Sequence, residues 1–166
     1  MSLPFKEQRG ITLIELLITL AIIGAVIAVS YSFYFYVNKS FMTSSKQSEV
    51  QFNVRMASER IEDIVRSASE MEIQQDYTSV AGKEAIYIEN SSLKHYKDGS
   101  STDLLGGNYG DISFHISFNK VSDGILGYTV TGEIDGEHSY QISKDVWILK
   151  IEKITGNSGK AIIFKP

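Results

Sequence analysis

One apolar segment near the N-terminus constrains this chain more than any other feature. Between Leu16 and Val37 no side chain carries a formal charge, and the run reaches the ~20 residues that a helix needs to cross a bilayer. No polar stripe of helical period runs through Leu16 to Val29, so no face of this helix is suited to water. Aromatic residues crowd its far end, as in an interfacial belt: Tyr31, Phe33, Tyr34, Phe35 and Tyr36. The segment predicts a helix that lies in lipid or among other subunits.

A short polar stretch, residues 1–10, precedes the apolar segment. It carries Lys6 and Arg9 against Glu7. Positive charge on this side favours a cytoplasmic N-terminus, with everything after Val37 outside the membrane.

Glu15 is the one formally charged residue from Ile11 to Val37. A carboxylate in a helix that enters lipid costs a few kcal/mol, so we treat it as a functional candidate. The natural partner of such a carboxylate would be a cation.

Three interpretations of the segment compete. The first is a plain single-span membrane anchor. The second is a secretory signal peptide, because Ala28-Val29-Ser30 is a small-residue site of the cleavable kind. Glu15 inside the apolar core, and the apolar residues beyond that site, argue against a signal peptide. The third is cleavage just before Ile11, which would create a free amine as the cation that Glu15 needs.

The residues around Ile11 resemble the processing site of type IV pilins and pseudopilins. A short basic leader that ends in glycine, Lys6-Glu7-Gln8-Arg9-Gly10, is followed by Ile11-Thr12-Leu13-Ile14-Glu15-Leu16-Leu17. In that family a membrane prepilin peptidase cuts after the glycine, the new N-terminus is N-methylated, and the fifth mature residue is glutamate. The resemblance implies that Gly10 ends the leader, Ile11 is the methylated N-terminus and Glu15 is the assembly glutamate.

Two positions depart from the family pattern. The family most often has phenylalanine where this chain has Ile11, although other apolar residues occur there. Many major pilins also carry a proline that loosens the helix where this chain has Ser32. The first departure is compatible with cleavage, and the second favours a minor subunit over a major one.

The segment after the apolar run changes to an amphipathic pattern. Apolar residues recur at steps of four and three, which is one stripe of a helix: Val50, Val54, Ala57, Ile61, Ile64, Ala68 and Met71. No proline or glycine lies between Ala25 and Met71, so the pattern predicts one continuous helix from Ile11 to about Met71. A coiled-coil seam is the alternative, but the stripe is short and diluted by alanine, so we expect it to pack on the chain's own sheet.

Alternating residues after Gln75 predict strands. Residues 85–88 and 93–96 flank a turn as in a hairpin, and apolar residues at 112, 114, 116 and 118 alternate with polar ones. Asp123-Gly124 and Asp135-Gly136 are turn signals, and the stretches 140–142, 146–149 and 161–164 complete the strands. The fold class is therefore α+β, with a long N-terminal helix packed on an antiparallel sheet, and helix-then-meander order resembles the minor-subunit branch of the pilin fold.

The predicted organisation has four parts. Residues 1–10 form the leader peptide and residues 11–37 the transmembrane or filament-core helix. Residues 38–75 form the amphipathic continuation of the helix, and residues 76–166 an extracytoplasmic sheet domain. The chain has 166 residues, of which 43% are hydrophobic and 22% charged, and this length suits one domain with a sizeable core.

Composition and motifs argue against several other functions. The chain has no cysteine, which excludes disulfides and thiolate chemistry, and its net charge of -4 argues against general nucleic-acid binding. His95, His115 and His138 are scattered over separate predicted strands, so we expect no metal site. The stretch 156–160 lacks the full phosphate-loop pattern, and the oxygen-rich stretch 98–111 lacks the spacing of a helix-loop-helix calcium site, although some pseudopilins hold calcium in a comparable loop. We expect no enzyme activity and no cofactor.

Two functions stay open at this stage. The first is a structural subunit, a minor pilin or pseudopilin, of a filament that serves piliation, secretion or DNA uptake. Its partners would be other pilin subunits and prepilin peptidase, and it would lie in the cytoplasmic membrane before assembly and on the cell surface afterwards. The second is a secreted or membrane-anchored binding module whose leader merely resembles the family's.

Overall fold

The computed structural model describes residues 11–166 apart from residues 81, 108 and 152. The chain divides into two compact units, Met1–Met42 and Thr43–Pro166. The first secondary-structure element is helix α1, Leu13–Val65, and every later element belongs to the second unit. A long helix and antiparallel-rich sheets confirm the predicted α+β class.

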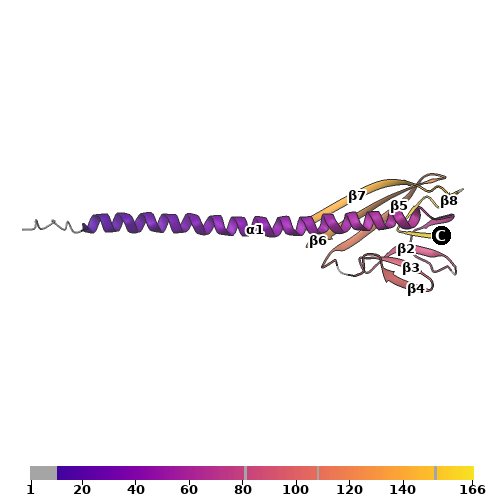
Figure 1. Ribbon diagram of the computed structural model, residues 1–166, viewed down its shortest axis with the longest axis horizontal. Helices are drawn as coiled ribbons and strands as arrows, with labels where there is room; N and C mark the ends of the chain where they lie inside the picture. Colours follow the sequence, from indigo (N-terminus) through magenta and orange to yellow (C-terminus); the bar gives the residue numbers. More distant parts are fainter. Residues whose placement is uncertain (1–10, 81, 108, 152) are drawn as a thin grey trace, which may run out of the picture. The chain divides into compact units, whose positions relative to one another are not determined.

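The predicted apolar stripe of α1 packs on the chain's own sheets, as expected. Val50, Val54, Ala57 and Ile61 are fully buried in the main core, together with strand residues such as Phe114. Val65 is buried where the spacing predicted Ile64, which is only partly buried. Figure 1 shows strands β5 to β7 running beside the last turns of α1.

The helix ends earlier than the sequence predicted. It stops at Val65, whereas the continuous stripe suggested Met71, and strand β1 begins at Glu70. Residues 70–74 alternate in burial, which is the period of a strand and not of a helix, and the backbone N–H of Ser69 already donates to the carbonyl of Lys165 at 2.7 Å. Pairing with strands on both sides satisfies the backbone of β1 and overrides the helical spacing.

Six strands form one sheet in the order β4-β3-β2-β10-β1-β8. Their bounds are β1 Glu70–Gln74, β2 Glu84–Glu89, β3 Ser92–Lys97, β4 Ser100–Asp103, β8 Ile154–Thr155 and β10 Ala161–Lys165. The predicted hairpin of residues 85–88 and 93–96 is confirmed as β2 and β3, and its turn uses positive φ at Asn90 and Ser91. Tyr77 stacks on Tyr87, with ring centroids 3.9 Å apart, and belongs to a smaller apolar cluster that includes Ala85 and Ile163.

Four strands form a second sheet in the order β7-β6-β5-β9. Their bounds are β5 Ser113–Ser122, β6 Ile125–Ile134, β7 His138–Trp147 and β9 Ser158–Gly159. The predicted alternation in β5 is confirmed, because Phe114, Ile116 and Phe118 are buried between exposed neighbours. The stretches predicted as separate strands at 140–142 and 146–149 are instead one strand as far as Trp147, because β7 pairs along the whole of β6.

The sheet arrangement corrects three further details of the prediction. The strands form two sheets rather than one, and β8 runs parallel to β1. The last strand, β10, does not close a meander but inserts between β2 and β1. Such a central position suits its residues, since Ala161, Ile162, Ile163 and Phe164 are all buried.

Candidate functional site

Helix α1 begins with a reciprocal pair of hydrogen bonds between Thr12 and Glu15. The backbone N–H of Thr12 donates to Glu15 Oε2 at 2.9 Å, and the Thr12 hydroxyl donates to the same oxygen at 3.0 Å. In return, the backbone N–H of Glu15 donates to Thr12 Oγ1 at 3.3 Å. These contacts form a capping box, in which the first N–H groups of the helix find side-chain partners.

The capping box gives Glu15 a local role that our sequence analysis did not identify. The signal was present, because Thr12 and Glu15 have the spacing that defines the motif. A carboxylate in the first turn also interacts favourably with the partial positive charge of the helix N-terminus. Glu15 is therefore held at the very start of the helix, close to Ile11.

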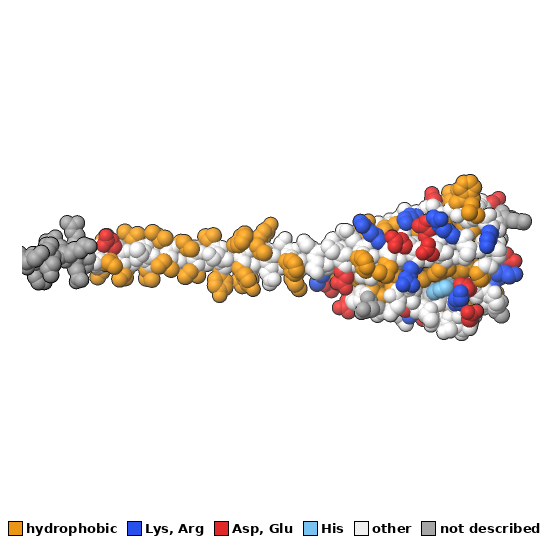
Figure 2. Space-filling model, in the orientation of Figure 1, with side chains coloured by type: hydrophobic (Ala, Val, Ile, Leu, Met, Phe, Trp, Pro, Cys, Tyr) orange, Lys and Arg blue, Asp and Glu red, His pale blue; other side chains and the backbone are white. Residues whose placement is uncertain are grey.

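The part of α1 that follows is apolar and exposed. Within the described residues it is long and apolar enough to cross a membrane, and none of its most apolar window is buried. Figure 2 shows hydrophobic side chains on all visible sides of it. Two of its serine hydroxyls are satisfied within the helix: Ser30 donates to the carbonyl of Val26 at 2.8 Å, and Ser32 to that of Ala28 at 3.0 Å. These two hydroxyls would therefore keep a hydrogen-bond partner in apolar surroundings.

Small residues leave one place on this helix open to close approach. A Cβ placed on Gly24 would meet no atom within 4 Å, and Ala28 lies one turn further on. A small-xxx-small pair of this kind permits close packing of another helix.

The predicted processing residues lie partly outside the described structure. Lys6, Arg9 and Gly10 are among the residues that the structure does not describe, whereas Ile11 is described and 78% exposed. The structure thus places Ile11, Thr12 and Glu15 together at the start of α1 and leaves the leader undescribed.

Comparison with known families identifies a motif that includes these predicted processing residues. Residues 5–31 match the family model for the prokaryotic N-terminal methylation motif. The chain carries the signature of type IV pilins and pseudopilins. Comparisons with curated proteins and with solved structures gave no match.

The three histidines of this chain do not converge on one site. His95 lies on β3 with its Nε2 2.9 Å from Glu84 Oε2, His115 is exposed on β5, and His138 begins β7. Among the described residues, no group of three or more histidine or carboxylate side chains is placed to hold a metal ion.

The oxygen-rich stretch of residues 98–111 was predicted to be a loop, but it contains a strand. Residues Ser100–Asp103 form β4 and pair with β3. Asp103 is engaged by the protein itself, because Tyr109 donates to Oδ2 at 2.6 Å and the N–H of Leu105 donates to Oδ1 at 3.0 Å. Burial, together with the hydrogen bond to Asp103, raises the pKa of Tyr109.

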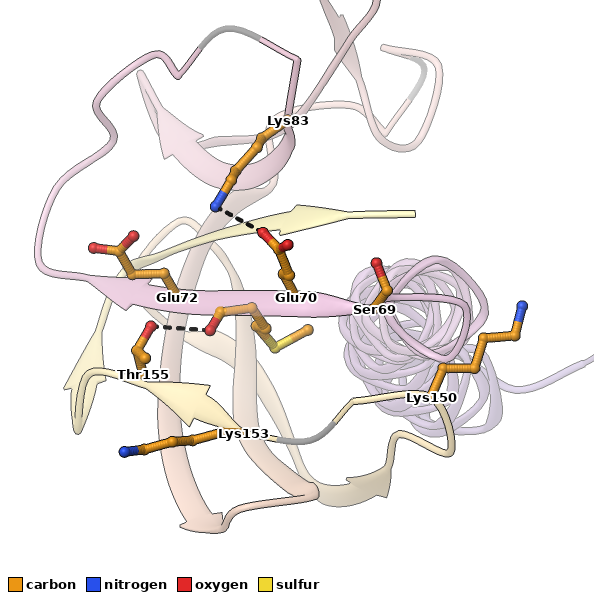
Figure 3. A pocket seen from close by; sticks show the side chains of 8 residues that line it. Ser69, Glu70, Glu72, Lys83, Lys150, Lys153 and Thr155 are labelled. Atoms are coloured by element: carbon orange, nitrogen blue, oxygen red, sulfur yellow. Dashed lines mark hydrogen bonds and ion pairs between the residues drawn. The ribbon is translucent and has the colours of Figure 1, made fainter.

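Lysines line a pocket beside β1 and β8 but do not form an anion site (Figure 3). The pocket has a volume of about 550 Å³, and Lys83 at its edge pairs with Glu70 at 3.4 Å. Lys150 and Lys153 point away from one another, so the ammonium groups do not meet around a common point. Thr155 donates to the carbonyl of Met71 at 3.1 Å and is likewise occupied by the protein.

Proposed function

We propose that this chain is a structural subunit, a minor pilin or pseudopilin, of a type IV pilus-like filament. The observation that carries the proposal is the methylation motif at residues 5–31, which overlaps the exposed apolar start of α1 and has Glu15 in the first turn of that helix. Such a filament would serve piliation, protein secretion or DNA uptake.

The proposed life cycle starts in the cytoplasmic membrane, with the leader in the cytoplasm. Prepilin peptidase would cut after Gly10, and Ile11 would become the methylated N-terminus. The apolar part of α1 would then leave the lipid and pack against the helices of neighbouring subunits, with Gly24 and Ala28 allowing close approach.

Assembly would use the new amine at Ile11 of one subunit and the Glu15 carboxylate of another. Each charge alone is costly in a medium of low dielectric constant, and pairing removes much of that cost. The proposal assigns no catalytic residue to this chain: its chemistry is cleavage and methylation by other proteins.

N-terminal sequencing of the membrane-extracted protein tests the proposal. An N-terminus at Ile11, with methylation shown by mass spectrometry, is the expected result. An N-terminus at Tyr31 would indicate a signal peptide, and one at Met1 a plain anchor; either would contradict the proposal. Detection of the chain in sheared surface filaments, or in secretion filaments, completes the test.

A further inference from the structure

The four-stranded sheet has two ends of different chemistry. One end carries the β5–β6 turn and the end of β7; we call Val121, Trp147, Leu149, Lys150 and Lys153 the Trp147 end. The other carries the β6–β7 turn; we call Glu49, Asp111, Asp135 and Glu137 the acidic end. Strand β6 spans Ile125–Ile134 between them, and at ~3.3 Å per residue it separates them by roughly 30 Å.

The Trp147 end exposes large apolar side chains. Trp147 is 71% exposed, Leu149 85% and Val121 49%. The backbone there is fixed, because the N–H of Ile148 donates to the carbonyl of Gly124 at 3.0 Å, and the indole Nε1 of Trp147 lies near Gly124. Figure 2 shows hydrophobic side chains projecting from the domain in the region where β7 ends in Figure 1. A cluster of this kind on a rigid edge marks an interaction surface.

Positive charge accompanies this apolar cluster. Lys150 directly follows Leu149 in the chain, and both Lys150 and Lys153 are exposed and extend away from the pocket that they border (Figure 3). The neighbouring Lys120 and Asp123 form an ion pair with each other. Among the described residues neither Lys150 nor Lys153 forms an ion pair, which suits both to a negatively charged partner.

The acidic end offers such a partner on the same chain. A cavity of about 270 Å³ is lined by Lys46, Glu49, Gly110, Asp111, Ile134 and Asp135. Lys46 pairs with Asp135, and this hydrogen bond lowers the pKa of Asp135, so its carboxylate stays ionised. Asp111 and Glu137 add further negative charge around Lys46. Figure 2 shows acidic side chains gathered at the end of the domain that carries the β6 label in Figure 1.

We propose that the Trp147 end docks on the acidic end of a second copy of this chain. Lys150 and Lys153 would face Asp111 and Glu137 of the neighbour, and Trp147 with Leu149 would lose water against its surface. Complementary charges fix the register and orientation of such a contact. Because the two surfaces lie at opposite ends of the sheet, the contact is head-to-tail and can repeat from copy to copy, as a filament requires. This inference rests on the proposed filament function, requires that copies of this chain stand next to one another in the filament, and names the partner of the sheet domain.

Cysteine cross-linking in assembled filaments tests the contact without background, because the chain has no cysteine of its own. The full-length variant Lys150→Cys with Asp111→Cys is expressed in cells, and sheared filaments are oxidised. We expect a ladder of dimers, trimers and longer species, with roughly tenfold more cross-linked material than in the control pair Ser100→Cys with Asp111→Cys. Residue 100 lies on the edge strand β4, away from the proposed contact. Lys153→Cys with Glu137→Cys gives a second, independent pair.

The outcomes separate the inference from the function on which it rests. If the variants enter filaments but neither pair gives a ladder, the head-to-tail contact is wrong while the filament function stands. If Lys150→Cys alone gives as much dimer as the double variant, the contact is symmetrical and the inference is wrong. If the unmodified chain never enters a filament, the proposed function itself fails. A reversal of charge, Lys150→Glu with Lys153→Glu, should weaken incorporation, and Asp111→Lys with Glu137→Lys in the same chain should restore it.

Discussion

Ser58 of helix α1 and Tyr128 of strand β6 are joined inside the core by two hydrogen bonds. The Tyr128 hydroxyl lies 2.8 Å from Ser58 Oγ and donates to the Ser58 carbonyl at 3.0 Å. Ser58 is fully buried and Tyr128 only 1% exposed. The bonds connect helix and sheet across the apolar core, so they fix the rotation of the helix as well as its distance from the sheet.

Tyr128→Phe should destabilise the sheet domain by about 1–2 kcal/mol, because both hydrogen bonds are lost and the Ser58 hydroxyl stays buried. Urea unfolding of the full chain in detergent, followed by near-ultraviolet circular dichroism, measures the change. The matched control is Tyr36→Phe, where the same atom is removed from an exposed side chain. Equal stability of the Tyr128→Phe variant and the unmodified chain would contradict the prediction.

Alkaline pH should weaken the same contact. Burial raises the pKa of Tyr128 above its ordinary value of about 10. Because the pKa is raised in the folded state, the contribution of protonated Tyr128 to the free energy of unfolding is fully present below about pH 10. This contribution is lost as the pH rises through the folded-state pKa. Between pH 9 and 11 the free energy of unfolding should therefore fall less steeply in Tyr128→Phe than in the unmodified chain. Parallel pH profiles for the two proteins would show that another group is responsible.

Acid should loosen the helix from β7 through Glu62. This carboxylate accepts hydrogen bonds from Arg66 and Lys144, and they lower its pKa below the ordinary 4.5. The contribution of Glu62 to the free energy of unfolding is present above the pKa of the unfolded state and is lost as the pH falls through the pKa of the folded state. Glu62→Gln should cost about 0.5–1 kcal/mol at pH 7, since the pairs are partly exposed, and nothing near pH 2. Glu59→Gln, on the exposed face of the same helix, is the control.

Gly132 of β6 lets the helix approach the sheet closely. A Cβ at this position would lie 2.6 Å from Val54 Cγ2 and 3.3 Å from Ile112 Cγ2. Gly132→Ala should therefore cost about 1–3 kcal/mol of stability by overpacking. Adding Val54→Ala should recover part of this loss, so that the two effects are not additive. Gly24→Ala, where the space is open, serves as the control; a similar loss there would contradict the steric explanation.

Local patterns predicted most of the elements but not how they join. The alternation of Phe114, Ile116 and Phe118 indicates β5, and Asp135-Gly136 indicates the turn between β6 and β7, because both signals depend on neighbouring residues alone. Met71 lies at a helical step of three from Ala68 and also alternates with Ile73, so its spacing fits both a helix and a strand. Pairing with β10, which lies far along the chain, places Met71 in strand β1 instead of the helix.

The candidate site divides in the same way. Glu15 was identified from its charge within an apolar run, which is a purely local signal. The capping contact with Thr12 depends on an equally local signal, the spacing of three residues between Thr12 and Glu15. The two ends of the four-stranded sheet could not be predicted, because Lys46, Asp111 and Asp135 meet only after helix, loop and turn have folded together.

The last prediction separates the two roles of Glu15, helix capping and assembly. Glutamine at this position can still accept the hydrogen bond from the Thr12 N–H, so Glu15→Gln retains the capping box but removes the charge. We expect this variant to insert into the membrane and to be cleaved before Ile11, yet to enter filaments roughly tenfold less well, because the neighbour's amine stays unpaired. Quantitative immunoblots of membrane and filament fractions measure both steps.

Thr12→Val is the matched variant, because it removes the capping hydroxyl and leaves the Glu15 charge in place. Valine keeps the backbone N–H that donates to Glu15, so only part of the cap is lost. Filament incorporation should then fall much less than in Glu15→Gln. Wild-type incorporation of Glu15→Gln would exclude charge pairing as the assembly mechanism. An equal defect in the two variants would instead show that Glu15 acts by ordering the first turn of the helix.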